Sequence, residues 1–145
     1  MRNRLADDLP DAPGAYVLVI EIAAELRLRL GQGRHWRLSP GRYAYCGSAY
    51  GPGGIGARVR RHMRRRKPRR WHVDRLTTAG RIVELHLSPG GSECALLAAL
   101  LAEPHVGVPI PGFGSSDCRH CPAHLVALPD GVDISGPIAV ASGVV

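Results

Sequence analysis

Two tripeptides near the start of the chain and three polar residues further along have side chains suited to chemistry. The tripeptides are Gly-Ala-Tyr at residues 14–16 and Tyr-Cys-Gly at residues 45–47, and they are followed by Arg58, His62 and Glu93. Two phenols, a guanidinium, an imidazole and one carboxylate are the groups that hydrolysis of a phosphodiester with a single metal ion would need. The sequence therefore suggests metal-dependent phosphodiester hydrolysis, provided that the fold brings these groups together.

Arg58 and His62 are four residues apart, so on a helix they would lie on the same face. An arginine at such a place can bind a phosphate through two parallel hydrogen bonds. The alternative is a solvated basic helix. That alternative is the better interpretation for Arg60, Arg61 and Arg64 when each is taken alone.

Glu93 and the two tyrosines have a structural explanation as well as a chemical one. Glu93 follows Ser92, an expected N-cap, and a carboxylate in the first turn of a helix is stabilised by about 0.3–1 kcal/mol. Mg²⁺ or Mn²⁺ needs only one or two protein carboxylates, because phosphate and water supply the other ligands, so Glu93 alone would be sufficient. Tyr16 and Tyr45 are either core aromatic residues or groups that orient or deprotonate an attacking water.

The positive charge of the chain is concentrated in one segment. The 145 residues carry a formal net charge of +7. Nine Lys and Arg and no acid fall within residues 58–70, and the 10 basic and 12 acidic residues elsewhere leave a net charge of −2. Such a pattern is typical of a surface that binds a polyanion. The residues expected to contact nucleic acid are Arg60, Arg61, Arg64, Arg65, Lys67, Arg69, Arg70 and His72.

Composition argues against several other classes of protein. An apolar fraction of 45% favours a folded domain over a disordered chain. No apolar run approaches the roughly 20 residues that span a bilayer, and the first eight residues lack the apolar stretch of a secretory signal. We therefore expect a cytoplasmic protein that binds a polyanion and that has no membrane association.

Alternating and β-branched segments predict strands at residues 16–22, 26–30, 42–47 and 81–88, with an edge strand at 124–128. We expect the first three to form an antiparallel meander. In the third strand, alternation places its two tyrosines on one face.

Apolar residues at every fourth position from Ile55 to Met63 predict a helix, which Pro68 would end. Further helices are expected at residues 71–76 and 93–103, and the last of these is apolar nearly all round and is therefore expected to be mostly buried. The fold class that follows is α+β, with a small, mostly antiparallel sheet of three core strands plus extra strands, flanked by helices. We expect one domain over residues 1–128 and a tail of unassigned structure over residues 129–145.

Cysteine and histidine form a second group of candidate ligands. With no export signal, four cysteines are expected to be thiols or metal ligands rather than disulfides. Cys118, Cys121 and His124 have the spacing of soft metal ligands, and a structural Zn²⁺ would need a fourth ligand from Cys94, Cys46 or His105. The alternatives are unliganded thiols in a loop or a redox-sensitive pair.

The ordered set resembles the GIY-YIG nuclease superfamily, with its two signatures at residues 14–16 and 45–47 and the helix arginine, the histidine and the glutamate at Arg58, His62 and Glu93. The resemblance covers roughly residues 14–128. Three longer runs resemble a little-characterised prokaryotic branch, some of whose members are fused to endonuclease III-type glycosylases. They are Tyr-Cys-Gly-Ser-Ala at 45–49, Trp-His-Val-Asp at 71–74 and Phe-Gly-Ser-Ser-Asp-Cys at 113–118.

The resemblance implies a GIY-YIG-like fold and hydrolysis of DNA with Mg²⁺ or Mn²⁺, in DNA repair or processing and in partnership with repair enzymes. It implies that Glu93 binds the metal, that Tyr16 activates the water and that Arg58 stabilises the charge of the transition state. Tyr45 and His62 would then fix hydrogen bonds around the phosphate, and His72 is a further candidate for the same site.

One departure from the family bears on activity. Many members have an asparagine after the glutamate, whereas the only asparagine of this chain is Asn3. Ser116 or Asp117 would have to replace it. Two alternatives to a nuclease therefore stay open: a nucleic-acid-binding module of the same fold with weak or no cleavage, and a zinc-stabilised interaction domain.

Overall fold

A computed structural model describes residues 9–30, 33–114 and 121–142 of the chain. These residues form an α+β fold with a four-stranded antiparallel sheet in the order β5-β1-β4-β6 and a separate sheet of β2 and β3. The strands are β1 (Gly14–Ile22), β2 (Leu26–Leu30), β3 (Arg34–Leu38), β4 (Gly41–Ala49), β5 (Arg81–Pro89) and β6 (Leu125–Leu128). The helices are α1 (Gly54–Met63), α2 (Val73–Ala79), α3 (Glu93–Leu101) and α4 (Ser135–Ala141).

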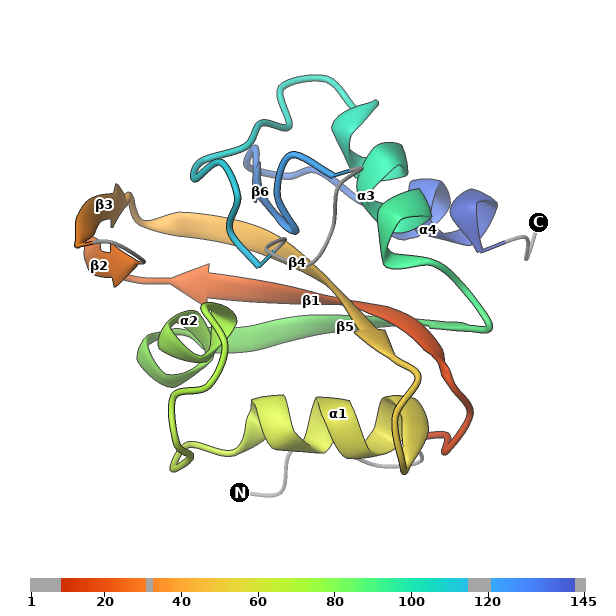
Figure 1. Cartoon of the computed structure of the whole chain (residues 1–145). Helices are drawn as coiled ribbons and strands as arrows, with labels where there is room; N and C mark the ends of the chain where they lie inside the picture. Colours follow the sequence, from red (N-terminus) through yellow and green to blue (C-terminus); the bar gives the residue numbers. More distant parts are fainter. Residues whose placement is uncertain (1–8, 31–32, 115–120, 143–145) are drawn as a thin grey trace.

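The main sheet is covered on both faces (Figure 1): α1 and α2 lie on one side, and α3 and α4 lie on the other. The central strand β1 is buried from residue 14 to residue 20, and its alternating side chains enter two cores. Tyr16 and Leu18 pack with residues of α1 and α2, whereas Val17 and Val19 pack with residues of α3 and α4. Burial on both faces explains why the segment is almost uniformly apolar.

The predicted strands are all present, but the predicted meander is wrong. β1 pairs with β4 and β5, whereas β2 pairs only with β3, a strand that the sequence analysis missed. Residues 31–32, between β2 and β3, are outside the described residues. The hairpin packs on the core through its apolar face, on which Leu28 and Leu38 are buried. β2 and β3 therefore form a separate sheet beside the main one.

The helix of residues 93–101 is less buried than expected. Leu96, Leu97 and Leu100 are buried, while Ala95 and Ala98 on the other face are exposed. Alanine carries too little apolar area to force that face inward, so the helix packs on the sheet by its leucines alone.

The segment after residue 128, for which the sequence analysis gave no structure, contains α4 within its described part. α4 packs against α3, and both Ile134 and Ile138 are buried in the core between the helices and the sheet. In the described residues, no helix combines the length and the apolar character needed to cross a bilayer.

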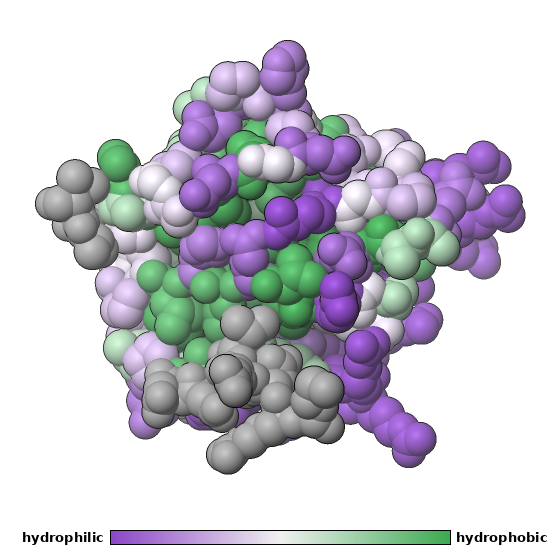
Figure 2. Space-filling model, turned by 180° about the vertical axis from the view of Figure 1, so that it is seen from behind, coloured by the Kyte–Doolittle hydropathy of each residue, from purple (hydrophilic) through white to green (hydrophobic). Residues whose placement is uncertain are grey.

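The two edges of the sheet differ. β5 forms one edge, where residues 82–87 are all partly exposed. Seen from behind, the molecule shows apolar surface in the middle of the face, bordered by hydrophilic side chains (Figure 2). At the other edge β6 pairs with β4 only along residues 42–45. Beyond Cys46, β4 pairs with β1 on one side but has no strand on its other side in the described residues, and a cleft opens there.

Candidate functional site

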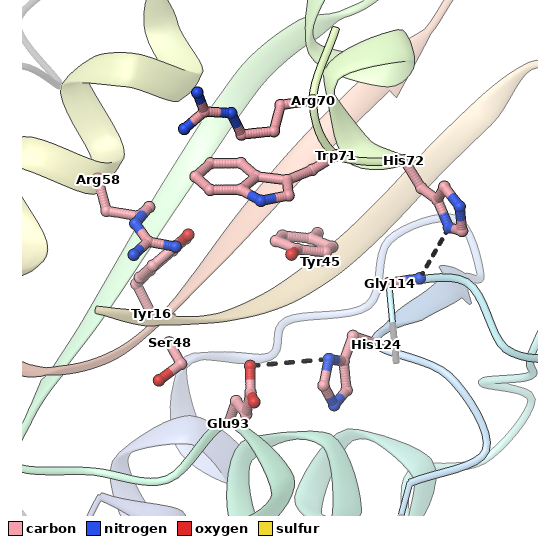
Figure 3. Close-up of a pocket in the computed structure, with 10 residues that line it drawn as sticks. All are labelled: Tyr16, Tyr45, Ser48, Arg58, Arg70, Trp71, His72, Glu93, Gly114 and His124. Carbon is pink, nitrogen blue, oxygen red and sulfur yellow. Dashed lines mark hydrogen bonds and ion pairs between the residues drawn. The ribbon is translucent and has the colours of Figure 1, made fainter. Parts of the chain in front are cut away.

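A cleft of about 290 Å³ lies between the start of α1 and the start of α3, next to the end of β4 (Figure 3). It brings together seven of the residues singled out in the sequence, which come from several separate segments: Tyr16, Tyr45, Arg58, Arg70, His72, Glu93 and His124. Among the described residues, the lining is Tyr16, Tyr45, Ser48, Arg58, Arg70, Trp71, His72, Glu93, Gly114 and His124.

His62 lies behind the cleft and contacts it through Tyr16. The hydroxyl of Tyr16 and Nε2 of His62 are 2.6 Å apart, and both side chains are buried. Burial, with the Lys67 cation nearby, lowers the pKa of His62 to about 3. Burial also raises the pKa of Tyr16 well above its usual value of 10, with a further increase from Tyr45 and an opposing effect from Arg58. At neutral pH the protein's own groups therefore leave a neutral phenol hydrogen-bonded to a neutral imidazole.

This pair makes stability depend on pH. The imidazole of His62 has a pKa of 6.5 in the unfolded chain and about 3 in the folded one, so the unfolded chain binds more protons between those values. The contribution of the neutral imidazole to stability is complete above pH 6.5 and is lost as the pH falls towards 3. Between about pH 6.5 and pH 5 we expect the free energy of unfolding to fall by about 2 kcal/mol through this group.

Urea denaturation across this pH range checks the expectation, with His62→Gln to remove the titration and His35→Gln, an exposed histidine of β3, as the control. The His62 variant should lose most of the pH dependence of the free energy of unfolding. An NMR titration of the wild type is the second measurement, and an imidazole of His62 that becomes protonated near pH 6.5 would contradict the assignment.

The position of the Tyr16 side chain explains why residue 47 is a glycine. The two residues are directly opposite each other in the pairing of β1 with β4. A Cβ atom at position 47 would collide with the ring and the hydroxyl of Tyr16. Only glycine leaves room for the phenol at this point of the sheet, so the glycine of the second tripeptide positions the tyrosine of the first.

Gly14 and the turn after β5 position Glu93. A Cβ atom at residue 14 would collide with the backbone of that turn, whose Gly90 N–H donates to the carbonyl of Pro13 at 2.8 Å. Two residues later Ser92 caps α3 by accepting from Ala95 N–H at 3.4 Å, as expected. Glu93 is the first residue of α3, and its side chain is 27% exposed at the cleft.

Trp71 is a cleft residue to which the sequence analysis gave no role. The guanidinium carbon of Arg58 lies 4.7 Å from the centre of the Trp71 ring, and that of Arg61 lies 4.1 Å from it. Such contacts hold a cation over an aromatic face and are worth about 0.5–2 kcal/mol. Trp71 therefore fixes the direction of Arg58 at the mouth of the cleft.

Arg61 is bound inside the domain by the buried carboxylate of Asp74. Its Nη1 donates to Oδ1 of Asp74 at 2.8 Å, and its Nη2 donates to Oδ2 at 3.0 Å. Burial acts to raise the pKa of Asp74, but hydrogen bonds from Arg61 and from the backbone N–H groups of Trp71 and Arg70 lower it to about 2. The ion pair ties α1 to the start of α2 and thus supports Trp71.

The other basic residues of the segment divide into exposed and internal groups. Lys67 donates from Nζ to the carbonyls of Arg61 and His62, at the end of α1. Six residues of the segment are exposed, and of these Arg65 also donates to the Gly80 carbonyl at 3.4 Å. The exposed set is Arg60, Arg64, Arg65, Arg66, Arg69 and Arg70.

A second basic surface, not apparent in the sequence, lies on the β2–β3 hairpin. Its outer face pairs Arg27 with Arg37 and Arg29 with His35, and all four are exposed. Like charges directly opposite each other across two strands are destabilising. The sequence analysis missed this surface because it counted the charge outside residues 58–70 as one sum. That sum is −2, and it conceals the local excess of arginine.

Two cysteines and a histidine, Cys94, Cys121 and His124, lie close together next to Glu93. Potential ligand atoms of Cys94, Cys121 and His124 all lie within 4.8 Å of one another. This group could hold a metal ion. Cys94 is one of the three residues considered as an additional ligand, while Cys46 and His105 are not part of the group. Cys118 lies outside the described residues, as do Ser116 and Asp117.

Ser48 and Gly114 are further lining residues that the sequence analysis did not single out. The signal for both was the runs at residues 45–49 and 113–118, which were noted only as resemblances. The Gly114 N–H donates to Nδ1 of His72 at 3.3 Å, so the loop and α2 are joined across the cleft.

Comparison with known proteins gives one match. The family described as "Domain of unknown function DUF123" matches residues 15–141, which includes α4. No curated protein and no solved structure matches the chain.

Proposed function

This chain belongs to the DUF123 family, a domain of unknown function, and from its own site we propose that it is an endonuclease that hydrolyses DNA phosphodiester bonds with a divalent metal ion. One observation carries the proposal: Tyr16, Tyr45, Arg58 and Glu93, from four separate elements, line a single cleft. The proposal places the chain among the GIY-YIG nucleases that it resembles.

Glu93 is suited to bind Mg²⁺ or Mn²⁺ in this cleft. It is the only carboxylate among the ten lining residues, and it is partly exposed at the start of α3. These hard cations take oxygen ligands and complete their shell with phosphate and water, so one carboxylate fits them. A bound ion would supply charge stabilisation at the scissile phosphate.

Tyr16 and Tyr45 are suited to orient the attacking water. Since burial keeps Tyr16 protonated, we assign its hydroxyl to hydrogen bonding rather than to proton removal in the ground state. Nε2 of His62 fixes the direction of that hydroxyl at 2.6 Å. Burial, with Glu93 nearby, likewise raises the pKa of Tyr45, which keeps a second neutral phenol beside the first.

Arg58 is suited to neutralise charge on the phosphate. Its guanidinium projects into the cleft from α1 and is held by the face of Trp71 at 4.7 Å. A guanidinium held in advance stabilises a transition state without the cost of ordering it during the reaction. Ser48, in the same cleft, offers a hydroxyl to a bound phosphate or water.

The proposed partner is DNA, bound through its phosphates, with RNA not excluded. One exposed arginine of α1 and five that follow the helix make a set of six, and four basic side chains lie on the outer face of the hairpin. If the six near α1 each contact a phosphate, the logarithm of the binding constant should fall with the logarithm of salt concentration at a slope of about −5. Fluorescence anisotropy with a labelled duplex measures this slope.

The hairpin makes a separate contribution in this proposal. Replacing both Arg29 and Arg37 by glutamine should make the salt slope shallower by about 2, because two phosphate contacts are lost. Arg81→Gln is the matched control, since Arg81 is an exposed arginine already paired with Glu21 at 3.1 Å. An unchanged slope in the double variant would remove the hairpin from the proposed interface.

The proposed cofactors are Mg²⁺ or Mn²⁺ at Glu93 and zinc at the group of Cys94, Cys121 and His124. The proposed compartment is the cytoplasm, and the proposed setting is DNA repair or processing together with other repair enzymes.

The activity is tested by nicking of supercoiled plasmid and by cleavage of duplex, flap, single-stranded and abasic substrates, with Mg²⁺ or Mn²⁺ and with EDTA. Salt-sensitive binding without cleavage of any substrate would favour the non-catalytic binding module.

A further inference from the structure

We infer that a zinc ion bound by Cys94, Cys121 and His124 positions Glu93, so that the metal group and the cleft form one connected unit. The role assigned to Glu93 in this inference rests on the proposed function, but the zinc site itself does not. The three ligand residues come from two segments, because Cys94 belongs to α3 while Cys121 and His124 precede β6.

His124 supplies the observation that points to a ligand. Its side chain is buried, with only 4% of its area exposed, and its Nε2 atom has no hydrogen-bond partner among the described residues. A buried imidazole nitrogen without a partner costs free energy, on the order of 1–3 kcal/mol. A metal ion at Nε2 would remove that cost.

The backbone of His124 is fixed by two hydrogen bonds. Its N–H donates to the carbonyl of Phe113 at 2.7 Å, and its carbonyl accepts from Cys46 N–H at 2.9 Å. The residue is thus held at the edge of the sheet. Figure 3 shows one ring nitrogen facing Glu93 and the other directed away from it.

The ligand types select zinc. Two cysteines and one histidine are soft and borderline donors, and this set favours zinc over Mg²⁺ or Mn²⁺. The two sulfur atoms are 2.7 Å apart. Two thiolates on a tetrahedral zinc lie about 3.8 Å apart, because each Zn–S bond is about 2.3 Å long. Binding therefore requires the sulfurs to separate by about 1 Å, which side-chain rotation can provide.

The connection to the cleft runs through the same imidazole. Nδ1 of His124 lies 3.6 Å from a carboxylate oxygen of Glu93. With zinc on Nε2, the proton of the ring resides on Nδ1 and is directed at Glu93, which is the arrangement in which a carboxylate orients a zinc-bound histidine. Here the carboxylate is also the proposed ligand of the catalytic metal, so His124 is a positioning residue for it.

The zinc site is tested on the full-length protein without reference to activity. Protein purified with reductant and without chelator should contain about one zinc per chain, and Co²⁺ in its place should give the intense visible absorption of a thiolate-bound tetrahedral ion. Cys94→Ser and Cys121→Ser should each lose the metal, while Cys46→Ala, a buried cysteine outside the group, should keep it. A Cys94–Cys121 disulfide, or protein without zinc and without the cobalt spectrum, would overturn the inference.

The coupling is tested with His124→Cys, which keeps a zinc ligand but cannot hydrogen-bond to Glu93 in the same way. This variant should retain zinc, yet bind Mn²⁺ in the cleft about 10- to 100-fold more weakly, as followed by the Mn²⁺ EPR signal. Removing zinc from the wild type with a chelator should also weaken Mn²⁺ binding. Unchanged Mn²⁺ affinity in both experiments would overturn the coupling, whereas absence of DNA cleavage with normal zinc and Mn²⁺ binding would count against the nuclease proposal alone.

Discussion

Glu93→Gln should lower the rate of metal-dependent DNA cleavage by about 100- to 1000-fold while DNA binding persists. The glutamine keeps the size of the side chain, and the position is partly exposed, so the fold should tolerate it. What is lost is the only carboxylate among the described residues of the cleft lining, and with it the proposed ligand of Mg²⁺ or Mn²⁺. Loss of a metal ion or of comparable charge stabilisation typically costs two to three orders of magnitude, or several kcal/mol of barrier.

Glu103→Gln is the matched control because Glu103 follows the other end of α3 and is not part of the cleft. Single-turnover cleavage of a labelled duplex measures the rate, and anisotropy measures binding. Full activity of the Glu93 variant at saturating Mg²⁺ would show that the carboxylate does not hold the catalytic metal.

Tyr16→Phe should lower kcat by about 100- to 1000-fold with little change in KM. The phenyl ring still fills the space above Gly47, so the change removes the hydroxyl alone. That hydroxyl contacts the attacking water in our proposal and nothing in the bound substrate that would set KM. The variant also leaves Nε2 of His62 without its partner, so a loss of stability of about 1–3 kcal/mol is expected as well.

Tyr43→Phe separates the two effects. Tyr43 lies on the same strand face as Tyr45, but its hydroxyl donates to the Ser39 carbonyl outside the cleft. The Tyr43→Phe variant should lose some stability and keep the DNA cleavage rate of the wild type. Rates for both variants are measured at a temperature where circular dichroism shows them folded. An unchanged kcat in Tyr16→Phe would exclude the hydroxyl from the chemistry.

Local patterns in the sequence were sufficient for most of the elements. A run of β-branched residues predicted β1, alternation predicted β2, β4 and β5, and a four-residue apolar repeat predicted α1. The hairpin partner of β2 was missed because Arg34–Leu38 carries two arginines and a histidine in five residues, which reads as polar loop. α4 was missed because a glycine and a proline near its start give weak helix signals.

The residues of the cleft were predicted largely from their types and order, whereas their supports were not. Nothing in the local sequence indicates that Trp71 lies against Arg58, since that contact depends on the Arg61–Asp74 ion pair between two helices. The meeting of Cys94 with Cys121 depends likewise on how α3 packs beside β6. Contacts between segments that are distant in sequence are set by the tertiary fold and cannot be read from local spacing.

The most direct test is a crystal structure of the protein grown with Mn²⁺, using the anomalous signal of the ion to locate it. Our account predicts a Mn²⁺ ion in the cleft, about 2.0–2.2 Å from a carboxylate oxygen of Glu93, with its open coordination positions facing Tyr16 and Arg58. A cleft without the ion at millimolar Mn²⁺, or Mn²⁺ bound only away from Glu93, would contradict it.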